Sequence, residues 1–512
     1  MADVAIVGAG PAGLVTARYL KSEGFDPVLF EQGDRVGGQW TGDARYSGVW
    51  PSMRTNTSRV MTAFSDLDYP EGAPVFPTNQ MVRDYLEAYA EQFDLLQSVR
   101  LGTAVEKIER DAAAEKWIVR SKSRDGKAAC ESFNHVVVAS GRYHKPLIPA
   151  VPGLDTFAGK GGVSHTFAYK NPEQYRGMRV VVAGCSISAL EIASDLAMLG
   201  AASVTVTVRR QRYVFHKLLA GVPTEHVAFT RFAVLAAECM PMEVVAGGLK
   251  DLIVKTSGSP EQFGAPKPAD SVLEAGITQC QHFLPLVAEG RICVRPWIQC
   301  IEGSVVHFMD GSTEEADALI FGTGYELDLP FLSDELKQTL NPDSKHIDLF
   351  GFTFHPDLPG LGFVGQLDLV GPYFPVLELQ ARWLAYTWSG AIPGPDREEM
   401  EAGLAVCRAR RNGPSEVPMH MAAIQFARAA GVEPDAAQWP GLTRALYFGP
   451  LSPASFRLQG RDSLADAPRR TAESAEAFGA VPTPELTPDQ KQQLDALASA
   501  QQGASLYSIS TG

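Results

Sequence analysis

The chain has 512 residues, of which 45% are hydrophobic and 20% charged, a balance typical of a folded globular protein and too apolar for a mostly disordered one. At roughly 100 to 200 residues per domain, this length predicts two to four domains and excludes a single small binding module. The formal net charge of −14 argues against a nucleic-acid partner for the chain as a whole.

Cysteine usage and the first residues of the chain bear on its compartment. Seven cysteines are present, an odd number, and no two are spaced as C-x-x-C, which argues against a disulfide scaffold and a zinc ribbon. The chain opens on an apolar strand pattern without the regions of a signal peptide, and no stretch of about 18 apolar residues follows. We therefore expect a cytoplasmic protein with no transmembrane segment and no metal site.

The first segment, residues 3–31, predicts a βαβ unit: a strand, a glycine-rich turn, a helix and a second strand. In its turn, Gly8 permits a tight bend, Gly10 lets the backbone approach a pyrophosphate, and Gly13 allows close packing of the helix. Glu31 follows at close to the spacing of about 20 residues that suits a carboxylate accepting from a ribose hydroxyl. The unit predicts a dinucleotide whose phosphates lie at the helix N-terminus.

A second βαβ pattern spans residues 178–210, with a weaker turn signature in which two of the three glycines are replaced by small residues. The turn residues are Gly184, Ser186 and Ala189. At the end of its second strand stand Arg209 and Arg210, where a cation would meet a 2'-phosphate, so this site favours NADPH over NADH. The alternative is a pair of solvated arginines capping a strand.

Two dinucleotide sites of opposite specificity imply hydride transfer from NADPH to a group bound at the first site, most plausibly a flavin. Further strands at 136–146, 317–332 and 360–366 end in small-residue turns, and the first two are expected to be crossings between two domains.

We predict an α/β fold of two Rossmann-like domains, with the NADPH-binding domain inserted into the FAD-binding domain and a C-terminal helical tail. The predicted boundaries are 1–165 and 317–470 for the FAD domain, 166–316 for the NADPH domain and 471–512 for the tail. A largely helical insertion is expected at about 214–281, either self-contained or acting as a lid over the substrate. In the tail, 467–484 resembles a linker, and Thr487 begins a short helix predicted to reach about Gln501.

These motifs, in this order, resemble the flavin-containing monooxygenase family of class B flavoproteins, which oxygenate nitrogen and sulfur centres. The resemblance covers about residues 1 to 475 and fits a bacterial-type member. It is carried by GAGPAG from Gly8, GGQW from Gly37 to Trp40, RTNTSRVMTAFSD from Arg54 to Asp66, SGRYHKP from Ser140 to Pro146, FGTGY from Phe321 to Tyr325, PVLELQARW from Pro375 to Trp383 and LYFGPLSPASFRL from Leu446 to Leu458.

One departure concerns the family signature before the second βαβ unit. It appears here as FAGKGGVSHTFAY, with two additional residues between Gly159 and His165. The mutual spacing of His165 and Tyr169 is kept, so the insertion affects the linker geometry and not the assignment. His165 is either functional or a satisfied structural histidine.

The resemblance implies that NADPH reduces FAD, that dioxygen adds at flavin carbon 4a, and that the resulting (hydro)peroxyflavin oxygenates a soft nucleophile such as a small amine, a sulfide or an indole-like compound. Asn56 is the catalytic candidate, since a neutral amide can donate a hydrogen bond without titrating; the alternative is that it caps a turn. Gln39 and Trp40 are expected near the flavin, and Ser186 and Ser188 near the NADPH phosphates, with core packing and helix capping as the respective alternatives. The remaining cofactor contacts that the resemblance implies are Pro11, Ala12, Gly38, Val105 and Gln366.

Alternative functions stay open at this point. Baeyer-Villiger oxidation of ketones and an uncoupled NADPH oxidase would use the same two-domain plan, although the arginine-bearing Baeyer-Villiger motif is not matched. A disulfide reductase would need a C-x-x-C pair, and a non-catalytic scaffold would not need intact nucleotide loops. Motifs that address only the cofactors do not identify the substrate. Dioxygen and a small molecule are the expected partners, and a homodimer is the commonest assembly.

Overall fold

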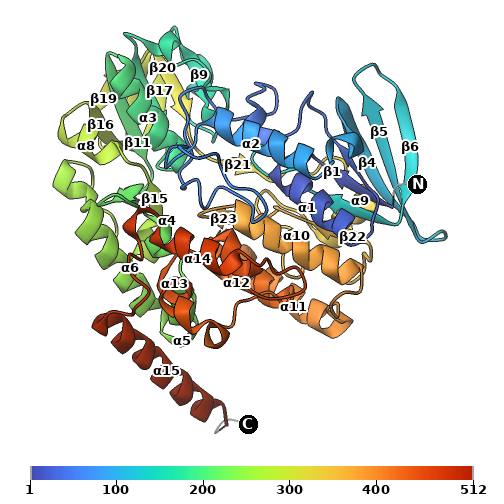
Figure 1. Ribbon diagram of the computed structural model, residues 1–512. Helices are drawn as coiled ribbons and strands as arrows, with labels where there is room; N and C mark the ends of the chain where they lie inside the picture. The colour runs from blue at the N-terminus through green and yellow to red at the C-terminus, as the bar shows by residue number, and fades with distance from the viewer. Residues whose placement is uncertain (1–2, 510–512) are drawn as a thin grey trace.

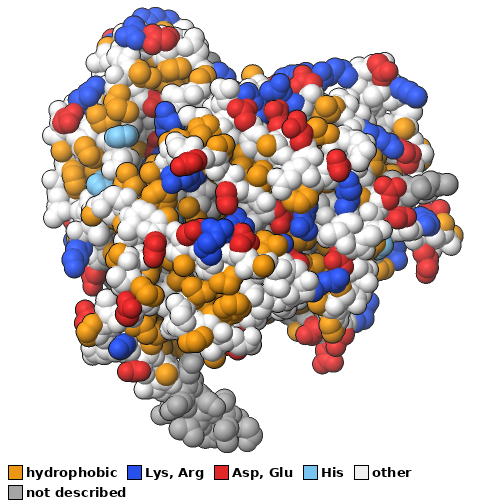
Figure 2. All heavy atoms as spheres, in the orientation of Figure 1, with side chains coloured by type: hydrophobic (Ala, Val, Ile, Leu, Met, Phe, Trp, Pro, Cys, Tyr) orange, Lys and Arg blue, Asp and Glu red, His pale blue; other side chains and the backbone are white. Residues whose placement is uncertain are grey.

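The computed structural model describes residues 3–509, with side chains described through residue 499. It contains two parallel five-stranded sheets, one in each half of the molecule (Figure 1). Among the described residues, no helix is long and apolar enough to cross a membrane. On the face shown in Figure 2, acidic and basic side chains are interspersed and do not separate into regions of one sign.

The first sheet has the order β22-β7-β1-β2-β3, and all of its pairs are parallel. Its strands are β1 (Val4–Val7), β2 (Pro27–Phe30), β3 (Val99–Arg100), β7 (His135–Val138) and β22 (Leu361–Phe363). The central strand VAIV is continuously apolar because both faces are covered. Val4 and Ile6 face α1 (Pro11–Ser22), α2 (Asn79–Gln92) and α10 (Phe374–Trp388). Ala5 and Val7 face the antiparallel sheet of β4 (Thr103–Asp111), β5 (Lys116–Ser123) and β6 (Ala128–Phe133), together with α9 (Asp334–Leu340).

The second sheet repeats this plan with the order β16-β11-β10-β20-β9, again all parallel. Its strands are β9 (Gly162–His165), β10 (Arg179–Ala183), β11 (Ser203–Val208), β16 (Ile292–Pro296) and β20 (Ala318–Phe321). Val180 and Val182 pack against α3 (Ile187–Leu199) and α8 (Phe283–Ala288). Val181 and Ala183 pack against the antiparallel sheet of β17 (Ile298–Glu302), β18 (Val305–Phe308) and β19 (Thr313–Glu315).

The strand pairing corrects the predicted boundaries at two places. Strands β9 and β20 both belong to the second sheet, where β20 pairs with β10 and β9 pairs with β20. The boundaries at residues 165 and 317 had placed both strands with the first domain. The short strands β8 (Lys145–Pro146) and β21 (Tyr325–Glu326) pair with each other, so the two crossing segments run side by side.

Residues 213–279 form the largely helical insertion, with a small core of its own. Its strands β12 (Tyr213–Phe215) and β15 (Ile277–Gln279) pair at the two ends and close the segment on itself. Between them lie β13 (Leu218–Leu219), β14 (Val222–Pro223), α4 (Glu225–Ala228), α5 (Arg231–Cys239), α6 (Met242–Ser257) and α7 (Val272–Ala275).

The C-terminal part consists mainly of helices that lie beside α10 and the insertion (Figure 1). They are α11 (Arg397–Ala409), α12 (Met419–Ala429), α13 (Thr443–Phe448), α14 (Ala467–Glu476) and α15 (Pro488–Ile509), with β24 (Glu416–Pro418) paired to β23 (Asp368–Val370).

The predicted linker at 467–484 is wrong over its first half, which is helix α14. Ala467, Thr471 and Ala475 are buried at four-residue spacing, a narrow stripe of small side chains that composition alone does not reveal. The predicted start of the last helix is confirmed, since Thr487 N donates to Gln490 Oε1 at 3.1 Å and Gln490 N donates to Thr487 Oγ1 at 3.2 Å. The helix runs to Ile509 and not only to Gln501, and it extends away from the body of the molecule in Figure 1.

Candidate functional site

The first glycine turn has the geometry of a dinucleotide loop. Gly8 has φ +105°, and a Cβ there would lie 2.6 Å from the carbonyl oxygen of Ala139 at the end of β7. A Cβ on Gly13 would lie 2.0 Å from the carbonyl oxygen of Gly8, so only glycine allows α1 to approach β1 so closely. Helix α1 begins at Pro11, and its N-cap residue, Gly10, has no side chain to occupy the free N–H groups. The first turn of α1, which also contains Ala12, is therefore open to an anion.

Glu31 lies directly beside this turn. Its Oε2 accepts from Ala9 N at 2.9 Å and its Oε1 accepts from Gly33 N at 2.7 Å, so the carboxylate is fixed at the end of β2. Burial raises the pKa of Glu31, and the backbone N–H groups of Ala9 and Gly33 oppose that rise. Each carboxylate oxygen keeps a lone pair that can accept from a ribose hydroxyl. Val105 lies on the neighbouring strand β4, which starts where Thr103 N donates to Glu31 O at 2.8 Å.

The GGQW motif faces the glycine turn. Gly38 has φ +57°, and a Cβ there would lie 3.0 Å from the Cα of Gly10, so the two turns touch backbone to backbone. Gln39 and Trp40 follow in a 3-10 turn, Gly38–Thr41, and Trp40 packs partly buried against the core around α1. Core packing therefore accounts for part of the burial of Trp40. The backbone oxygen of Gln39 accepts a hydrogen bond from Ser47 Oγ.

Two buried polar atoms near the carboxyl edge of the first sheet bear on whether a dinucleotide fits there. The buried Gln366 Oε1, after β22, and the buried Ser140 Oγ, after β7, have no hydrogen-bond partner among the described residues. Unpartnered buried polar atoms are costly unless a ligand or water meets them. Their position past the strand ends, together with the glycine backbone and Glu31, fits a bound dinucleotide.

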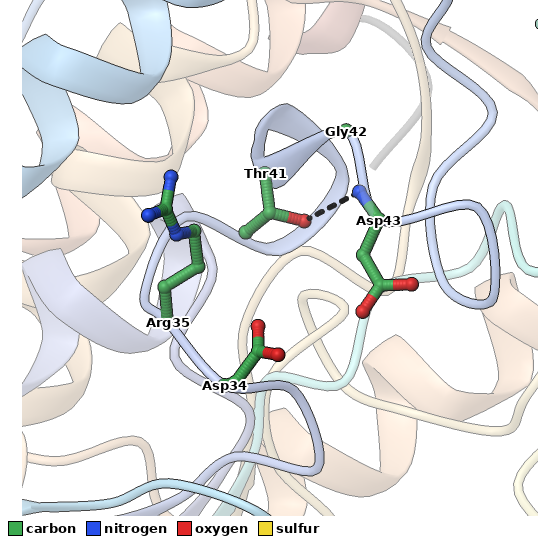
Figure 3. A pocket seen from close by; sticks show the side chains of 5 residues that line it. All are labelled: Asp34, Arg35, Thr41, Gly42 and Asp43. Atoms are coloured by element: carbon green, nitrogen blue, oxygen red, sulfur yellow. Dashed lines mark hydrogen bonds between the residues drawn. The ribbon is translucent and has the colours of Figure 1, made fainter.

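A shallow pocket of about 400 Å³ lies beside this motif (Figure 3). Asp34, Arg35, Thr41, Gly42 and Asp43 line it, and Asp43 N donates to Thr41 Oγ1 at 3.3 Å. Its charged lining suits a polar group. Asn56 is not among its lining residues, so it is not a substrate cavity around the catalytic candidate.

The second nucleotide turn keeps the same geometry with different residues. Gly184 has φ +137°, and a Cβ there would lie 2.3 Å from the carbonyl oxygen of Gly322, at the end of β20. Ala189 replaces the third glycine because Gly322 leaves it room: a Cβ on Gly322 would lie 2.6 Å from the Ala189 Cβ. Ser186, at the N-cap of α3, donates its hydroxyl to Gly322 O at 3.1 Å and does not cap the helix. The capping alternative therefore fails for Ser186, and the half-buried Ser188 lies in the same first turn.

Arg209 and Arg210 are both exposed at the end of β11. The Arg209 guanidinium carbon lies 4.7 Å from the ring centre of Trp297, a stacking partner that no sequence pattern indicated. Arg210 Nη1 donates to Glu274 O at 2.9 Å. The arrangement leaves the Arg209 guanidinium presented to solvent at the strand end, where a 2'-phosphate is expected.

Asn56 lies in the irregular stretch between the 3-10 turn Gly38–Thr41 and α2, and it is half-buried. Its amide forms no hydrogen bond with any residue that the structure describes, so it does not cap a turn there. Its neighbours are fixed: Thr55 N donates to Pro77 O at 3.0 Å, and Thr55 Oγ1 donates to Thr57 O at 2.7 Å. An amide held in place by its neighbours and without a partner of its own is free to bind a ligand.

The stretch around Asn56 is tied to the second half of the molecule. Lys170 Nζ donates to Ser47 O at 2.5 Å and to Val49 O at 2.8 Å, and burial lowers the pKa of Lys170 to about 8. Asp195 Oδ2 accepts from Trp50 Nε1 at 3.0 Å and from the Ser52 hydroxyl at 2.6 Å. Sequence reasoning missed Lys170 and Asp195, because nothing in the chain pattern pairs them with residues more than a hundred positions away.

His165 is hydrogen-bonded through one ring nitrogen, while its buried Nε2 has no partner among the described residues. Its Nδ1 accepts from Phe167 N at 3.0 Å, its ring contacts the edge of Tyr325, and burial lowers its pKa to about 4. It is therefore a neutral, buried histidine at neutral pH.

Comparison with known proteins gives the family. The model of the family described as flavin-binding monooxygenase-like matches residues 1–472. The rat protein called dimethylaniline monooxygenase [N-oxide-forming] 2 is 31% identical over 483 residues, covering 89% of this chain and 88% of its own. Human flavin-containing monooxygenase 2 is 29% identical over 483 residues with the same coverage.

Solved structures agree in fold. S-allyl-L-cysteine S-oxygenase from Allium sativum has a TM-score of 0.64 at 24% identity and covers 98% of both chains. Cyclohexanone monooxygenase from Rhodococcus sp. Phi1 bound to NADP+ has a TM-score of 0.62 at 19% identity, covering 85% of this chain and 97% of its own. The chain belongs to the flavin-binding monooxygenase-like family and is a flavin-containing monooxygenase.

Proposed function

We propose that this monooxygenase oxygenates soft nitrogen or sulfur atoms of small molecules, with Asn56 as the catalytic residue. The observation that carries the proposal is the Asn56 amide, which is held in place by its neighbours but has no hydrogen-bond partner among the described residues. The names of the similar proteins point the same way, since one is described as N-oxide-forming and another as an S-oxygenase.

When bound, FAD supplies hydride acceptance from NADPH and the activation of dioxygen. The residues proposed to hold it are Gly8, Gly10, Pro11, Ala12, Gly13, Glu31, Gly38, Gln39, Trp40, Val105 and Gln366. In this role, the first turn of α1 binds the pyrophosphate and Glu31 accepts from a ribose hydroxyl. The backbone of Gly10 and Gly38 allows the close approach that a side chain would block.

Ser186, Ser188, Arg209 and Arg210 are proposed to hold NADPH. The first two lie in the first turn of α3 and suit the pyrophosphate, while the arginines suit the 2'-phosphate. Asn56 is neutral at every accessible pH, so its amide can donate to an oxygen atom at the reacting centre without adding a proton that would promote release of peroxide.

The test is NADPH-dependent product formation from trimethylamine, a thioether, indole and cyclohexanone, with hydrogen peroxide measured in parallel. We expect amine or sulfide oxides from the wild type. Asn56→Ala should keep FAD and still oxidise NADPH, but most of the electrons should appear as peroxide. The exposed Asn412, changed to Ala, is the matched control and should behave as wild type.

Two results would overturn the proposal. A lactone from cyclohexanone without amine or sulfide oxides would assign Baeyer-Villiger oxidation, and peroxide equal to all NADPH consumed would assign an oxidase. Unchanged product per NADPH in Asn56→Ala would remove the role of that residue.

A further inference from the structure

Two buried, ionisable side chains of the insertion face the stretch that carries Asn56. Glu225 and His226, on α4, are 1% and 0% exposed, and both contact Ser58, two residues after Asn56. Ser58 N donates to Glu225 Oε1, and Ser58 Oγ shares a hydrogen bond of 2.8 Å with His226 Nε2. Ser58 is itself 0% exposed. The backbone and side chain of one residue are therefore both held by α4.

Helix α4 is itself held firmly at its start. Thr224 N donates to Lys217 O at 3.0 Å, and the Thr224 hydroxyl donates to His216 O. These bonds fix α4 to the strand segment that precedes it in the insertion. The position of Ser58 is therefore set by a helix of the insertion, whose Glu225 lies 167 residues further along the chain.

The burial of these groups is costly. Glu225 Oε2 and His226 Nδ1 have no hydrogen-bond partner among the described residues. The charge of Lys217 opposes the rise in the pKa of Glu225, and Lys217 Nζ lies 4.8 Å from the ring centre of Phe76. Burial raises the pKa of Glu225 to about 7 and lowers that of His226 to about 4. Burying two ionisable side chains costs free energy, which fits a role in fixing one conformation of the contact between α4 and Ser58.

The other side of His226 is closed by the C-terminal part of the chain. The ring of Phe478 lies 5.3 Å from the His226 ring and 5.0 Å from the guanidinium carbon of Arg59, the residue after Ser58. Phe478 has φ +61°, a conformation that L side chains rarely adopt. The contact between α4 and Ser58 is therefore shielded from water on the side of the tail.

We infer that Glu225 is a positioning residue for Asn56, acting through the Ser58 N–H, with His226 as a second support. This inference rests on the proposed role of Asn56. The Asn56 amide has no bonds of its own, so its direction depends on the backbone on either side. Thr55 fixes the preceding residue, and Glu225 fixes the residue two positions later. Loss of the Glu225 carboxylate would remove the acceptor of the Ser58 N–H, and the Asn56 amide would then be free to turn.

The experiment compares Glu225→Ala and Glu225→Gln in the FAD-bound enzyme, with Glu243→Ala, an exposed acid on α6, as the matched control. Hydrogen exchange of residues 54–64 is measured without substrate, and product and peroxide per NADPH are measured with it. We expect exchange in 54–64 to rise on the order of tenfold in Glu225→Ala. We also expect a several-fold fall in product per NADPH, made up by peroxide, and an unchanged KM for NADPH.

Glu225→Gln should restore both readouts, because its amide presents the same carbonyl oxygen to Ser58 N–H. Exchange and product yield unchanged in Glu225→Ala, or no rescue by Gln, would overturn the inference. If Glu225→Ala does not retain FAD, Glu225→Asp decides instead: its shorter side chain withdraws the carboxylate from the Ser58 N–H, so faster exchange in 54–64 supports the inference and unchanged exchange refutes it. Ser58→Ala keeps the N–H and removes only the bond to His226, so it measures the second support by itself. A wild type that forms no oxygenated product refutes the proposed function alone, since the exchange readout needs no substrate.

Discussion

Replacing Arg209 with Gln tests whether the end of β11 reads the 2'-phosphate of NADPH. The substitution removes the charge and keeps a side chain of similar length. The Arg209 guanidinium is exposed and lies 4.7 Å from the ring centre of Trp297, which holds it in place. It forms no salt bridge with any of the described residues. Little side-chain entropy is then lost when the phosphate binds.

The expected size of the effect follows from the bonds lost. A hydrogen bond to a charged group contributes about 1.5 to 3 kcal/mol, which corresponds to roughly 10- to 150-fold in affinity. Arg210 remains nearby with one of its nitrogens bonded to Glu274 O, so it compensates in part. We therefore expect the Kd for NADPH to rise on the order of 10- to 50-fold, and the Kd for NADH to change by less than about twofold.

The assay is the reduction of bound FAD by NADPH and by NADH in rapid mixing, at two salt concentrations. Trp297→Leu keeps the charge but removes its stacking partner, and should weaken NADPH binding by only about two- to fivefold. Arg124→Gln, an exposed arginine of the first half, is the control and should change neither Kd. An equal rise for both nucleotides in Arg209→Gln would show that the 2'-phosphate is recognised elsewhere.

Three further substitutions test the site and the scaffold. Gly13→Ala places a methyl group 2.0 Å from the Gly8 carbonyl oxygen, so the purified protein should lose most of its FAD; a normal flavin-to-protein absorbance ratio would contradict this. The raised pKa of Glu225, about 7, favours the protonated folded form, so its contribution to stability is present below about pH 4.5 and is lost as the pH rises through 7. The stability of wild type relative to Glu225→Gln should then fall by about 3 kcal/mol between these values, and parallel unfolding midpoints from pH 4.5 to 8.5 would refute it. Arg382→Met removes the bond of Arg382 Nη2 to Asp462 at 2.6 Å, whereas Arg457 still pairs with Asp462 at 2.8 Å. The variant should therefore lose about 1.5 to 3 kcal/mol in denaturant unfolding, and a wild-type midpoint would contradict this.

The parts of the site that follow a local pattern could be predicted from the sequence. At three positions a side chain would meet backbone within 2.6 Å: Gly8, Gly13 and Gly184. Such positions can be recognised in a sequence because only glycine fits them. The continuously apolar strands were also legible, since a sheet covered on both faces requires them. The two predicted βαβ units and their parallel strands therefore agree with the structure.

The parts that depend on contacts between distant segments could not be predicted. The sequence of β20 gives an apolar strand followed by a small-residue turn, but not the sheet that it joins; that is decided by its pairing with Val180 to Ala183. Likewise, α14 has too few apolar residues to show a helical face, because its buried stripe consists of the small residues Ala467, Thr471 and Ala475.

The stretch around Asn56 explains why the family motifs leave the substrate open. Local bonds, such as those of Thr55 and Thr62, hold the stretch from within, while Lys170, Asp195 and Glu225 hold it from residues more than a hundred positions away. Of these three residues, Glu225 belongs to the insertion, so the contact that fixes Ser58 depends on a segment outside the Asn56 motif. A motif confined to one segment carries no record of that contact.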